Sequence, residues 1–249
     1  MGYHGIAQSP LSEDLSRLQV APGRFRLQIE LMLAAGFRFV TVAQFADELH
    51  DGEPPVGLAA ISFDDGMRNN YTTALPILQS YGVPATVYVV VDLIGGRSPW
   101  IGPGGDGEML AESELIELHR AGWEIGAHTL SHPDLSILDY GACRAQIEGG
   151  RDALARITGA QIETFAYPFG RYGTAALDAA RDAGLRAAVT TGSGSWERYQ
   201  LTRAMISAGD PLLVVLLKIT DLYEPILRAP PLRVARGASK RLRDRLRRR

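Results

Sequence analysis

The sequence predicts an α/β protein in which helical crossovers connect the strands of a parallel sheet. The chain has 249 residues with 46% hydrophobic content, and strand-like segments alternate with helix-like ones along it. This length fits one globular domain of the size that α/β barrels reach. Six strands are expected near residues 37–42, 57–63, 85–91, 123–127, 163–167 and 186–191.

The segments between these strands have the apolar spacing and the end signals of helices. In the clearest one, residues 113–122, Ser113 is the expected N-cap and Gly122 the expected stop. A Gly- and Pro-rich segment, residues 95–107, is expected to form a long loop beside the strand ends, where binding loops commonly lie. Further helices are expected over residues 24–35, 43–50, 139–157 and 173–183.

The composition favours a soluble, cytoplasmic protein. The first residues lack a basic segment followed by a long apolar one, so no secretory signal is visible. The longest apolar run, residues 211–217, is far shorter than the ~20 residues that cross a bilayer. The single cysteine, Cys143, excludes an intramolecular disulfide and is expected to fill the core.

The charge is distributed unevenly along the chain. Residues 228–249 hold ten Lys and Arg against one acid, whereas residues 1–227 have a net charge of −11. We therefore expect a domain over residues 1–227 and a basic, solvated tail over residues 228–249. The alternative for the tail is contact with an anionic membrane surface. Nucleic acid ranks third, because the acidic body offers no accompanying basic surface.

The first chemical motif is Ser-Phe-Asp-Asp-Gly at residues 62–66, where an apolar run ends in two adjacent carboxylates. Side chains on a strand alternate between faces, so Asp64 and Asp65 cannot point the same way. We therefore expect them to have different roles, one holding a ligand and the other acting on it.

The second motif is His-Thr-Leu-Ser-His at residues 128–132. If this segment is helical, His128 and His132 share a face and can bind one metal ion, although ordinary polar residues also occur at this spacing. Its position strengthens the metal interpretation, because parallel α/β proteins build their sites at the carboxyl ends of strands. We expect these histidines to meet Asp64 and Asp65 at one rim of the sheet.

The third motif, Phe-Ala-Tyr-Pro-Phe-Gly at residues 165–170, leads from a strand into a turn. Its proline and glycine fix a tight backbone path, which can direct an N–H toward a bound oxygen. The simpler interpretation is an ordinary turn between a strand and a helix.

In this order, the three motifs resemble those of the polysaccharide deacetylase family, which has the NodB-homology domain, and the match covers most of residues 1–205. The resemblance implies a distorted (β/α)7-type barrel and metal-dependent deacetylation of carbohydrates. By matching position, it implies that Asp64 is the catalytic base and that Asp65, His128 and His132 are the metal ligands. Zn²⁺ suits such mixed ligation, which also admits Co²⁺, Ni²⁺ or Mn²⁺.

This division of roles suits amide hydrolysis. A metal ion held by one carboxylate and two imidazoles lowers the pKa of bound water toward ~7 and retains open coordination positions. Asp64 can take the proton as the water attacks. We expect the backbone N–H of Phe169 to contact the developing oxyanion, with Tyr167 and Pro168 in the same turn.

Two positions depart from the family pattern. The arginine that orients the base in the family's third motif is replaced by Ala166, so Arg203 or Arg171 is expected to supply the guanidinium, with Arg203 favoured. The family's late Leu-x-His motif, which provides the general acid, is also absent, because no histidine follows His132.

His4 is the candidate for the missing acid. Some exopolysaccharide deacetylases of this family are circularly permuted and carry an N-terminal Tyr-His segment, which residues 2–6 resemble. The alternative is an ordinary histidine in a frayed terminus, and the sequence does not decide between the two.

The expected substrate is an N-acetylated sugar, a glycan, or a lipid- or nucleotide-linked sugar. Sugar rings stack on aromatic faces, so Trp100 is a candidate platform, although tryptophan is more often used in core packing. Two alternatives remain: a hydrolase of non-sugar C–N bonds at the same metal site, and a silent carbohydrate-binding member of the fold.

Overall fold

The computed structural model describes residues 1–10, 12–50, 52–192 and 195–219. The chain forms two compact units, of which the first is Met1–Gly209 and the second begins at Asp210. Within its described residues, the second unit contains one helix, α7 (Leu212–Ile219). The expected domain limit at residue 227 and the basic tail, residues 228–249, lie outside the described residues.

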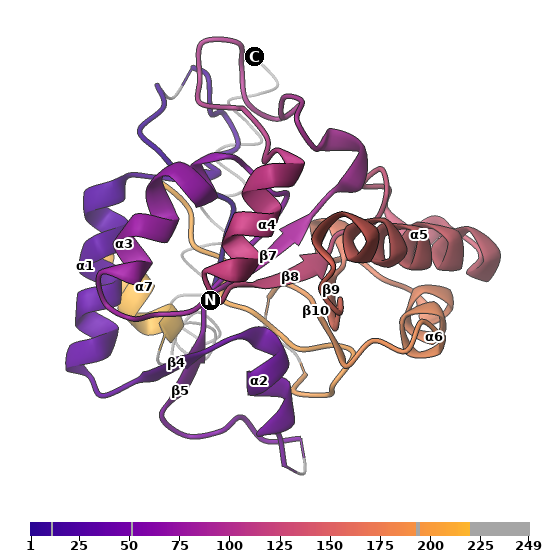
Figure 1. Ribbon diagram of the computed structural model, residues 1–249. Helices are drawn as coiled ribbons and strands as arrows, with labels where there is room; N and C mark the ends of the chain where they lie inside the picture. The colour runs from indigo at the N-terminus through magenta and orange to yellow at the C-terminus, as the bar shows by residue number, and fades with distance from the viewer. Residues whose placement is uncertain (11, 51, 193–194, 220–249) are drawn as a thin grey trace, which may run out of the picture. The chain divides into compact units, whose positions relative to one another are not determined.

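A six-stranded parallel sheet lies at the centre of the first unit (Figure 1). Its strands, in spatial order, are β1 (Gly2–Tyr3), β6 (Ser62–Phe63), β7 (Thr86–Val89), β8 (Glu124–Ala127), β9 (Thr164–Ala166) and β10 (Ala187–Val189). Two smaller parallel pairs join β2 (Gly5–Ile6) to β3 (Gln19–Val20), and β4 (Arg38–Val40) to β5 (Leu58–Ala60).

All six expected strands are present, but the one expected over residues 57–63 is divided at Ile61. Its first part, β5, pairs with β4, whereas its second part, β6, pairs with β1 and β7. The structure also contains three short strands that were not expected: β1, β2 and β3.

The segment that follows β10 connects the two edges of the sheet. Leu201 forms a parallel bridge with Val189 of β10, and Met205 forms one with Gly2 of β1. The parallel sheet is therefore curled, which confirms the expected distorted (β/α) barrel. Arg203 lies between these two bridges, and the closure brings it beside β6.

Six helices flank the strands of the first unit (Figure 1): α1 (Pro22–Ala34), α2 (Val42–Asp47), α3 (Leu75–Gln79), α4 (Glu112–Arg120), α5 (Tyr140–Thr158) and α6 (Thr174–Asp182). Four shorter helical turns are η1 (Asn70–Ala74), η2 (Val91–Leu93), η3 (Leu135–Ile137) and η4 (Pro168–Gly170). The five expected helices are present, and α3 has no counterpart among them.

The helix ends show how side chains satisfy the first backbone N–H groups. Thr41 and Gln44 form a reciprocal capping box at α2. The prediction of Ser113 as the N-cap of α4 was wrong, because the cap is Ala111 and Ser113 lies inside the first turn. The Glu114 carboxylate accepts the N–H of the cap residue Ala111 at 3.0 Å, which is the glutamate half of a capping box.

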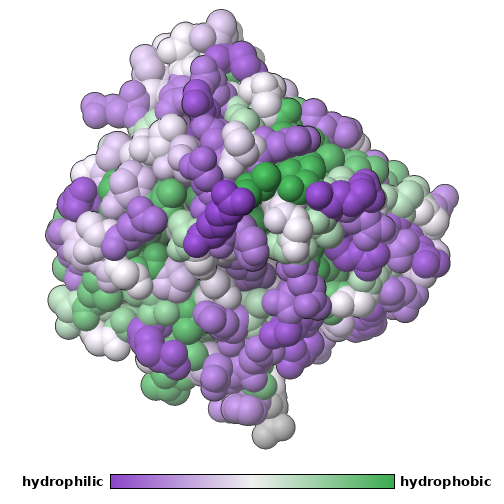
Figure 2. Space-filling view, viewed as in Figure 1, coloured by the Kyte–Doolittle hydropathy of each residue, from purple (hydrophilic) through white to green (hydrophobic). Residues whose placement is uncertain are grey.

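Apolar side chains fill the interior of the first unit, and polar side chains cover much of the face in Figure 2. Trp123 stacks on Phe63 with ring centroids 5.3 Å apart, and Cys143 is a buried free thiol, as expected. The expected loop over residues 95–107 contains turns but no helix. Among the described helices, none is both long and apolar enough to span a membrane.

Candidate active site

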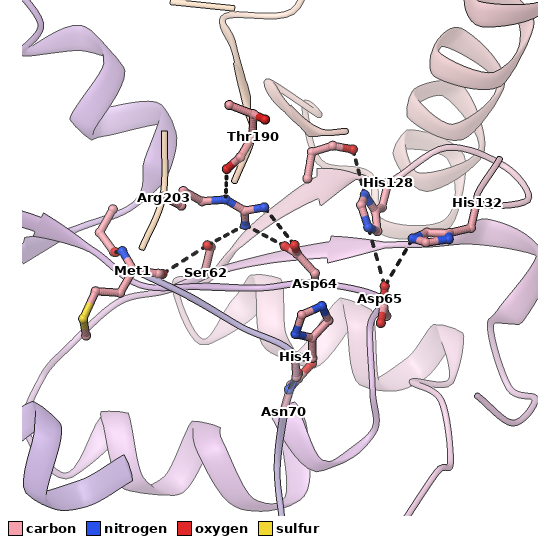
Figure 3. A network of polar contacts seen from close by, with 12 residues as sticks. Met1, His4, Ser62, Asp64, Asp65, Asn70, His128, His132, Thr190 and Arg203 are labelled. Carbon is pink, nitrogen blue, oxygen red and sulfur yellow. Dashed lines mark hydrogen bonds and ion pairs between the residues drawn. The ribbon is translucent and has the colours of Figure 1, made fainter. Parts of the chain in front are cut away.

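Two adjacent aspartates follow β6 and point toward different partners (Figure 3). Asp64 points toward Arg203 and Asp65 toward His128 and His132. Asp65 has a left-handed backbone with a φ of 73°, a conformation uncommon outside glycine and asparagine. The two carboxylates therefore serve separate groups of side chains, as expected, although both follow the end of β6 and the left-handed turn at Asp65, rather than strand alternation, directs them apart.

Asp65, His128 and His132 form a group that can hold a cation. The Asp65 Oδ1 atom lies 3.5 Å from Nε2 of His128 and 3.6 Å from Nε2 of His132, and all three ligand atoms lie within 4.8 Å of one another. Two ligand atoms bound at about 2.1 Å to a tetrahedral ion are about 3.4 Å apart. One carboxylate and two imidazoles at these distances fit a divalent metal ion.

A backbone carbonyl orients the His128 ring. The Nδ1 atom of His128 lies 2.7 Å from the carbonyl oxygen of Ala166. A neutral ring that donates through Nδ1 keeps its lone pair on Nε2, the atom that faces Asp65. Ala166 thus supports the ligand group through its backbone carbonyl.

The two histidines converge through a turn, because the motif that contains them is not helical. Thr129 and His132 have φ values of 70° and 62°, and the Thr129 hydroxyl accepts the N–H of His132 at 2.8 Å. The Gln146 side chain on α5 accepts the N–H groups of Leu130 and Ser131, both at 3.1 Å. The helical premise for this motif was therefore wrong, although the two imidazoles do meet.

Arg203 forms a two-pronged ion pair with Asp64. Its Nη1 and Nη2 atoms lie 2.6 and 2.8 Å from the two carboxylate oxygens, and both side chains are buried. The guanidinium also donates to the Ser62 hydroxyl at 2.9 Å and to the Thr190 carbonyl at 3.2 Å. These contacts fix the orientation of the Asp64 carboxylate.

The environment sets the charge states of these groups. Burial alone would raise the pKa of Asp64, but the charge and hydrogen bonds of Arg203 lower it to about 2. Burial and the neighbouring His128 lower the pKa of His132 to about 4. Burial is the largest influence on His128 and opposes its charge, but the Asp65 and Asp64 carboxylates and the Ala166 carbonyl together raise its pKa. At neutral pH Asp64 is ionised and His132 is neutral, the form that binds metal.

His4 follows β1 and lies beside the two aspartates. The strand before it pairs with β6, and the Tyr3 carbonyl accepts the N–H of Asp64 at 2.8 Å. The His4 ring points toward Asp64 and Asp65 (Figure 3). The segment that carries His4 is therefore paired with the sheet rather than frayed.

Two aromatic rings flank His132 at the rim. The Trp100 and Phe169 centroids lie 4.7 and 4.6 Å from the His132 ring, both edge to face. Phe169 is 54% exposed and has a left-handed backbone with a φ of 59°. The side chains of Tyr167 and Pro168, which precede it, are buried.

The comparisons with known proteins agree with this arrangement. The sequence profile described as "Polysaccharide deacetylase" matches residues 51–188, more than half of the chain. The chain belongs to the polysaccharide deacetylase family. The similarity confirms the resemblance on which the expected fold and site were based.

Two curated relatives and one solved structure illustrate the breadth of this deacetylase family. YxkH of Bacillus subtilis is 27% identical over 212 residues, which cover 83% of this chain and 70% of the relative. The poly-beta-1,6-N-acetyl-D-glucosamine N-deacetylase of Staphylococcus aureus is 26% identical and covers 79% and 70%. The deacetylase PplD of Streptococcus pyogenes, solved with acetate, has a TM-score of 0.75 and 26% identity, and the match covers 88% of this chain and 96% of PplD.

The guanidinium beside Asp64 comes from a distant part of the sequence. Arg203 reaches the carboxylate from 139 positions further along the chain. Arg171, the other arginine considered, is exposed and pairs with Asp134 at 2.9 Å. Of the two, Arg203 is therefore the one that contacts Asp64.

Several side chains that hold the site could not be selected from the sequence. Thr190 and Gln146 are ordinary polar residues that no motif marks, and Ser62 begins the first motif but had no predicted role. These supporting residues become visible only through their contacts.

Proposed function

We propose that this chain is a metal-dependent hydrolase that removes an acetyl group from an N-acetylated sugar or glycan. The observation that carries the proposal is the pairing of a buried Asp-His-His group with a second, separately oriented carboxylate. Asp65, His128 and His132 would hold the ion. A divalent ion there, with Zn²⁺ first and Co²⁺, Ni²⁺ or Mn²⁺ as alternatives, would make water more acidic and polarise the acetyl carbonyl.

Asp64 is the proposed general base. It lies next to the ligand Asp65, and the pKa of about 2 keeps its carboxylate ionised at neutral pH. Arg203 is the proposed positioning residue, because its two contacts hold the carboxylate in one orientation. An ionised, fixed carboxylate can accept the proton that the attacking water loses.

His4 is the proposed general acid. A sugar amine is too basic to leave without a proton, so a donor is needed on the leaving-group side. The support for His4 is its ring orientation toward the aspartates (Figure 3) and the pairing of its strand with β6.

The rim formed by Trp100 and Phe169 is the proposed contact surface for the sugar. Phe169 presents an exposed ring, and Trp100 contacts the same histidine from another loop. The turn of Tyr167 and Pro168 sets the backbone at Phe169, whose N–H is the proposed donor to the acetyl oxygen. The S. aureus relative, named for a glycan of N-acetylglucosamine, supports an N-acetylated sugar as the substrate class.

The proposed function is tested by acetate release. The purified chain is stripped of metal with a chelator, reloaded with one divalent ion at a time, and incubated with N-acetylglucosamine oligomers. We expect acetate only in the reloaded samples. Activity on simple non-sugar amides, with none on the oligomers, would favour the other hydrolase. Sugar binding without acetate under every metal would favour the silent carbohydrate-binding protein.

We also propose that the second unit contacts an anionic membrane surface. Helix α7 exposes Leu212, Leu213 and Leu216, and the sequence after residue 227 holds ten basic residues against one acid. Basic residues near anionic lipid contribute about 1 kcal/mol each. Co-sedimentation with vesicles of phosphatidylserine and phosphatidylcholine tests this proposal, and equal binding to pure phosphatidylcholine would contradict it.

A further inference from the structure

Two buried asparagines follow the motif of the two aspartates and contact the segment that carries His4. The Nδ2 atom of Asn70 donates to the His4 carbonyl at 2.8 Å. The Oδ1 atom of Asn69 accepts the N–H of Ile6 at 3.0 Å. Both asparagines are almost fully buried. The backbone on the carboxyl side of His4 is therefore held at two points by neighbouring side chains.

The packing around Gly5 shows how close this contact is. A Cβ atom at Gly5 would lie 2.9 Å from the Asn69 Oδ1 atom and 2.8 Å from the Met67 sulfur. Gly5 is the residue between the two hydrogen-bonded positions, and its lack of a side chain permits the approach. The segment from Met67 to Asn70 thus fixes the backbone of residues 4–6 by close packing and hydrogen bonds.

The same short connection fixes both sides of His4. Before His4, the Tyr3 carbonyl accepts the N–H of Asp64; after it, Asn70 holds the His4 carbonyl. Asn70 begins η1, a π-helical turn, and such turns often occur at functional sites. The proposed base, one proposed metal ligand and the anchor of the proposed acid are therefore carried by residues 64–70.

The Asn70 amide is not explained by stability alone. Among the described residues, its Oδ1 atom is buried without a hydrogen-bond partner. An unsatisfied buried acceptor is destabilising, so the contact that accounts for this side chain is the donation of its Nδ2 atom to the His4 carbonyl.

We propose that Asn70 is a positioning residue that holds His4 in the orientation needed for proton donation. This inference rests on the proposed function, in which His4 is the general acid. Asn70 acts through the backbone of His4, so its effect depends on the presence of the imidazole.

A double-mutant cycle tests this dependence. We expect Asn70→Ala to lower kcat roughly tenfold to a hundredfold, because a small misplacement of a reacting group has effects of this size. Bound metal and KM should stay within about twofold, since neither the ligands nor the sugar-facing rings are altered. In the His4→Ala background, the same Asn70→Ala substitution should lower kcat no further.

Gln28→Leu is the matched control. Gln28 is also buried, and it accepts a hydrogen bond from the Tyr3 hydroxyl at 2.9 Å, one residue before His4. This variant loses a buried hydrogen bond of the same segment without touching the His4 carbonyl. An equal loss of kcat in Gln28→Leu would overturn the positioning role, as would losses that multiply between His4→Ala and Asn70→Ala.

Two further results keep the outcomes distinct. If Asn70→Ala fails to fold, Asn70→Leu replaces it, because leucine has the same branched shape, carries no charge and cannot donate to the His4 carbonyl. An undiminished kcat in His4→Ala would remove both the acid assignment and the role of Asn70, while metal-dependent acetate release would still stand. Loss of metal dependence itself would instead overturn the proposed function.

Discussion

Asp64 and Glu124 are two carboxylates at opposite ends of the same parallel sheet. Asp64 follows the carboxyl end of β6 and pairs with Arg203. Glu124 begins β8 and has uncharged partners: it accepts hydrogen bonds from the hydroxyls of Thr86 and Thr164, which begin β7 and β9. The N–H of Ala43, in the first turn of α2, also donates to Glu124 at 3.0 Å.

The difference between the two ends separates a reactive arrangement from a structural one. At the Glu124 end, neutral donors meet the carboxylate and connect three strands to a helix start. At the other end, Asp65 faces two imidazoles at distances longer than hydrogen bonds. These distances leave room for a bound ion between the ligands, whereas the Glu124 network is satisfied as it stands. Chemistry is therefore expected at one end of the barrel and stability at the other.

The largest expected loss of activity comes from replacing either of the two neighbouring aspartates, and bound metal distinguishes their roles. Asp64→Asn and Asp65→Asn should each lower acetate release at least about 1000-fold, because one removes the proposed base and the other a metal ligand. Only Asp65→Asn should lose bound metal, as measured by elemental analysis. Metal loss in Asp64→Asn with retention in Asp65→Asn would mean that the two roles are exchanged.

Replacing Arg203 tests the charge pair at the reactive end. Arg203→Met leaves Asp64 buried without its partner, which should cost about 3–5 kcal/mol in the free energy of unfolding at neutral pH. In the folded wild type the pKa of Asp64 is lowered from 3.8 to about 2. The stabilisation is therefore present above pH 3.8 and is lost as the pH falls through about 2.

The same variant should also change the pH dependence of activity. Without Arg203, burial is expected to raise the pKa of Asp64, so the acidic limb of the rate profile should move to higher pH. Arg171→Met is the control, because Arg171 is exposed and its ion pair should contribute at most about 1 kcal/mol. An unchanged acidic limb in Arg203→Met would contradict Asp64 as the base that this arginine orients.

Gln146 tests the support of the turn that holds the histidines. Gln146→Leu removes the acceptor for the N–H groups of Leu130 and Ser131, so metal affinity should fall about 10- to 100-fold. Competition with a chelator of known affinity measures this change. Arg144→Leu, on the same helix but in a surface pair with Glu148, should leave the affinity unaltered.

The smallest expected effect is the change in stability on replacing Glu124, at the end of the sheet opposite the candidate site. Burial raises the pKa of Glu124 above its ordinary value of 4.5 despite its hydrogen bonds. At a pH between 4.5 and the raised pKa, the folded protein keeps a proton on Glu124 that the unfolded chain releases. The contribution of this group to stability therefore declines as the pH rises from 4.5 through the raised pKa. Glu124→Gln should flatten this decline and change stability by less than about 1.5 kcal/mol.

Urea unfolding at several pH values measures the effect of Glu124→Gln. The amide keeps an oxygen for Ala43 and Thr86 and offers a donor to Thr164, so activity should not change. Glu124→Ala removes the acceptor altogether and should cost about 1–3 kcal/mol. A loss of metal binding in Glu124→Gln would contradict the separation between the two ends.

Local sequence patterns were sufficient for the longer strands and for a site at their carboxyl ends, whereas the family resemblance supplied the choice of ligands and β1, β2 and β3 were missed. Short apolar runs indicate strands, and Asp65 and the motif of His128 and His132 follow such runs. In a parallel sheet the carboxyl ends of the strands share one edge, so these three side chains are expected to converge there. The division at Ile61 was not visible, because the apolar run is continuous and only the change of pairing partner breaks it. The N-cap of α4 was misassigned because the cap residue, Ala111, has no polar side chain that marks it in the sequence.

The sequence by itself determined the α/β class and the placement of Asp64, Asp65 and His128 directly after apolar strands. Tertiary structure alone decided which arginine meets Asp64, how the His128 ring is oriented, and what holds His4. The physical reason is that the first set depends on backbone periodicity within a few residues. The second depends on barrel closure, which brings Arg203 and Asp64 together across 139 positions of sequence and supplies a carbonyl that no side-chain pattern encodes.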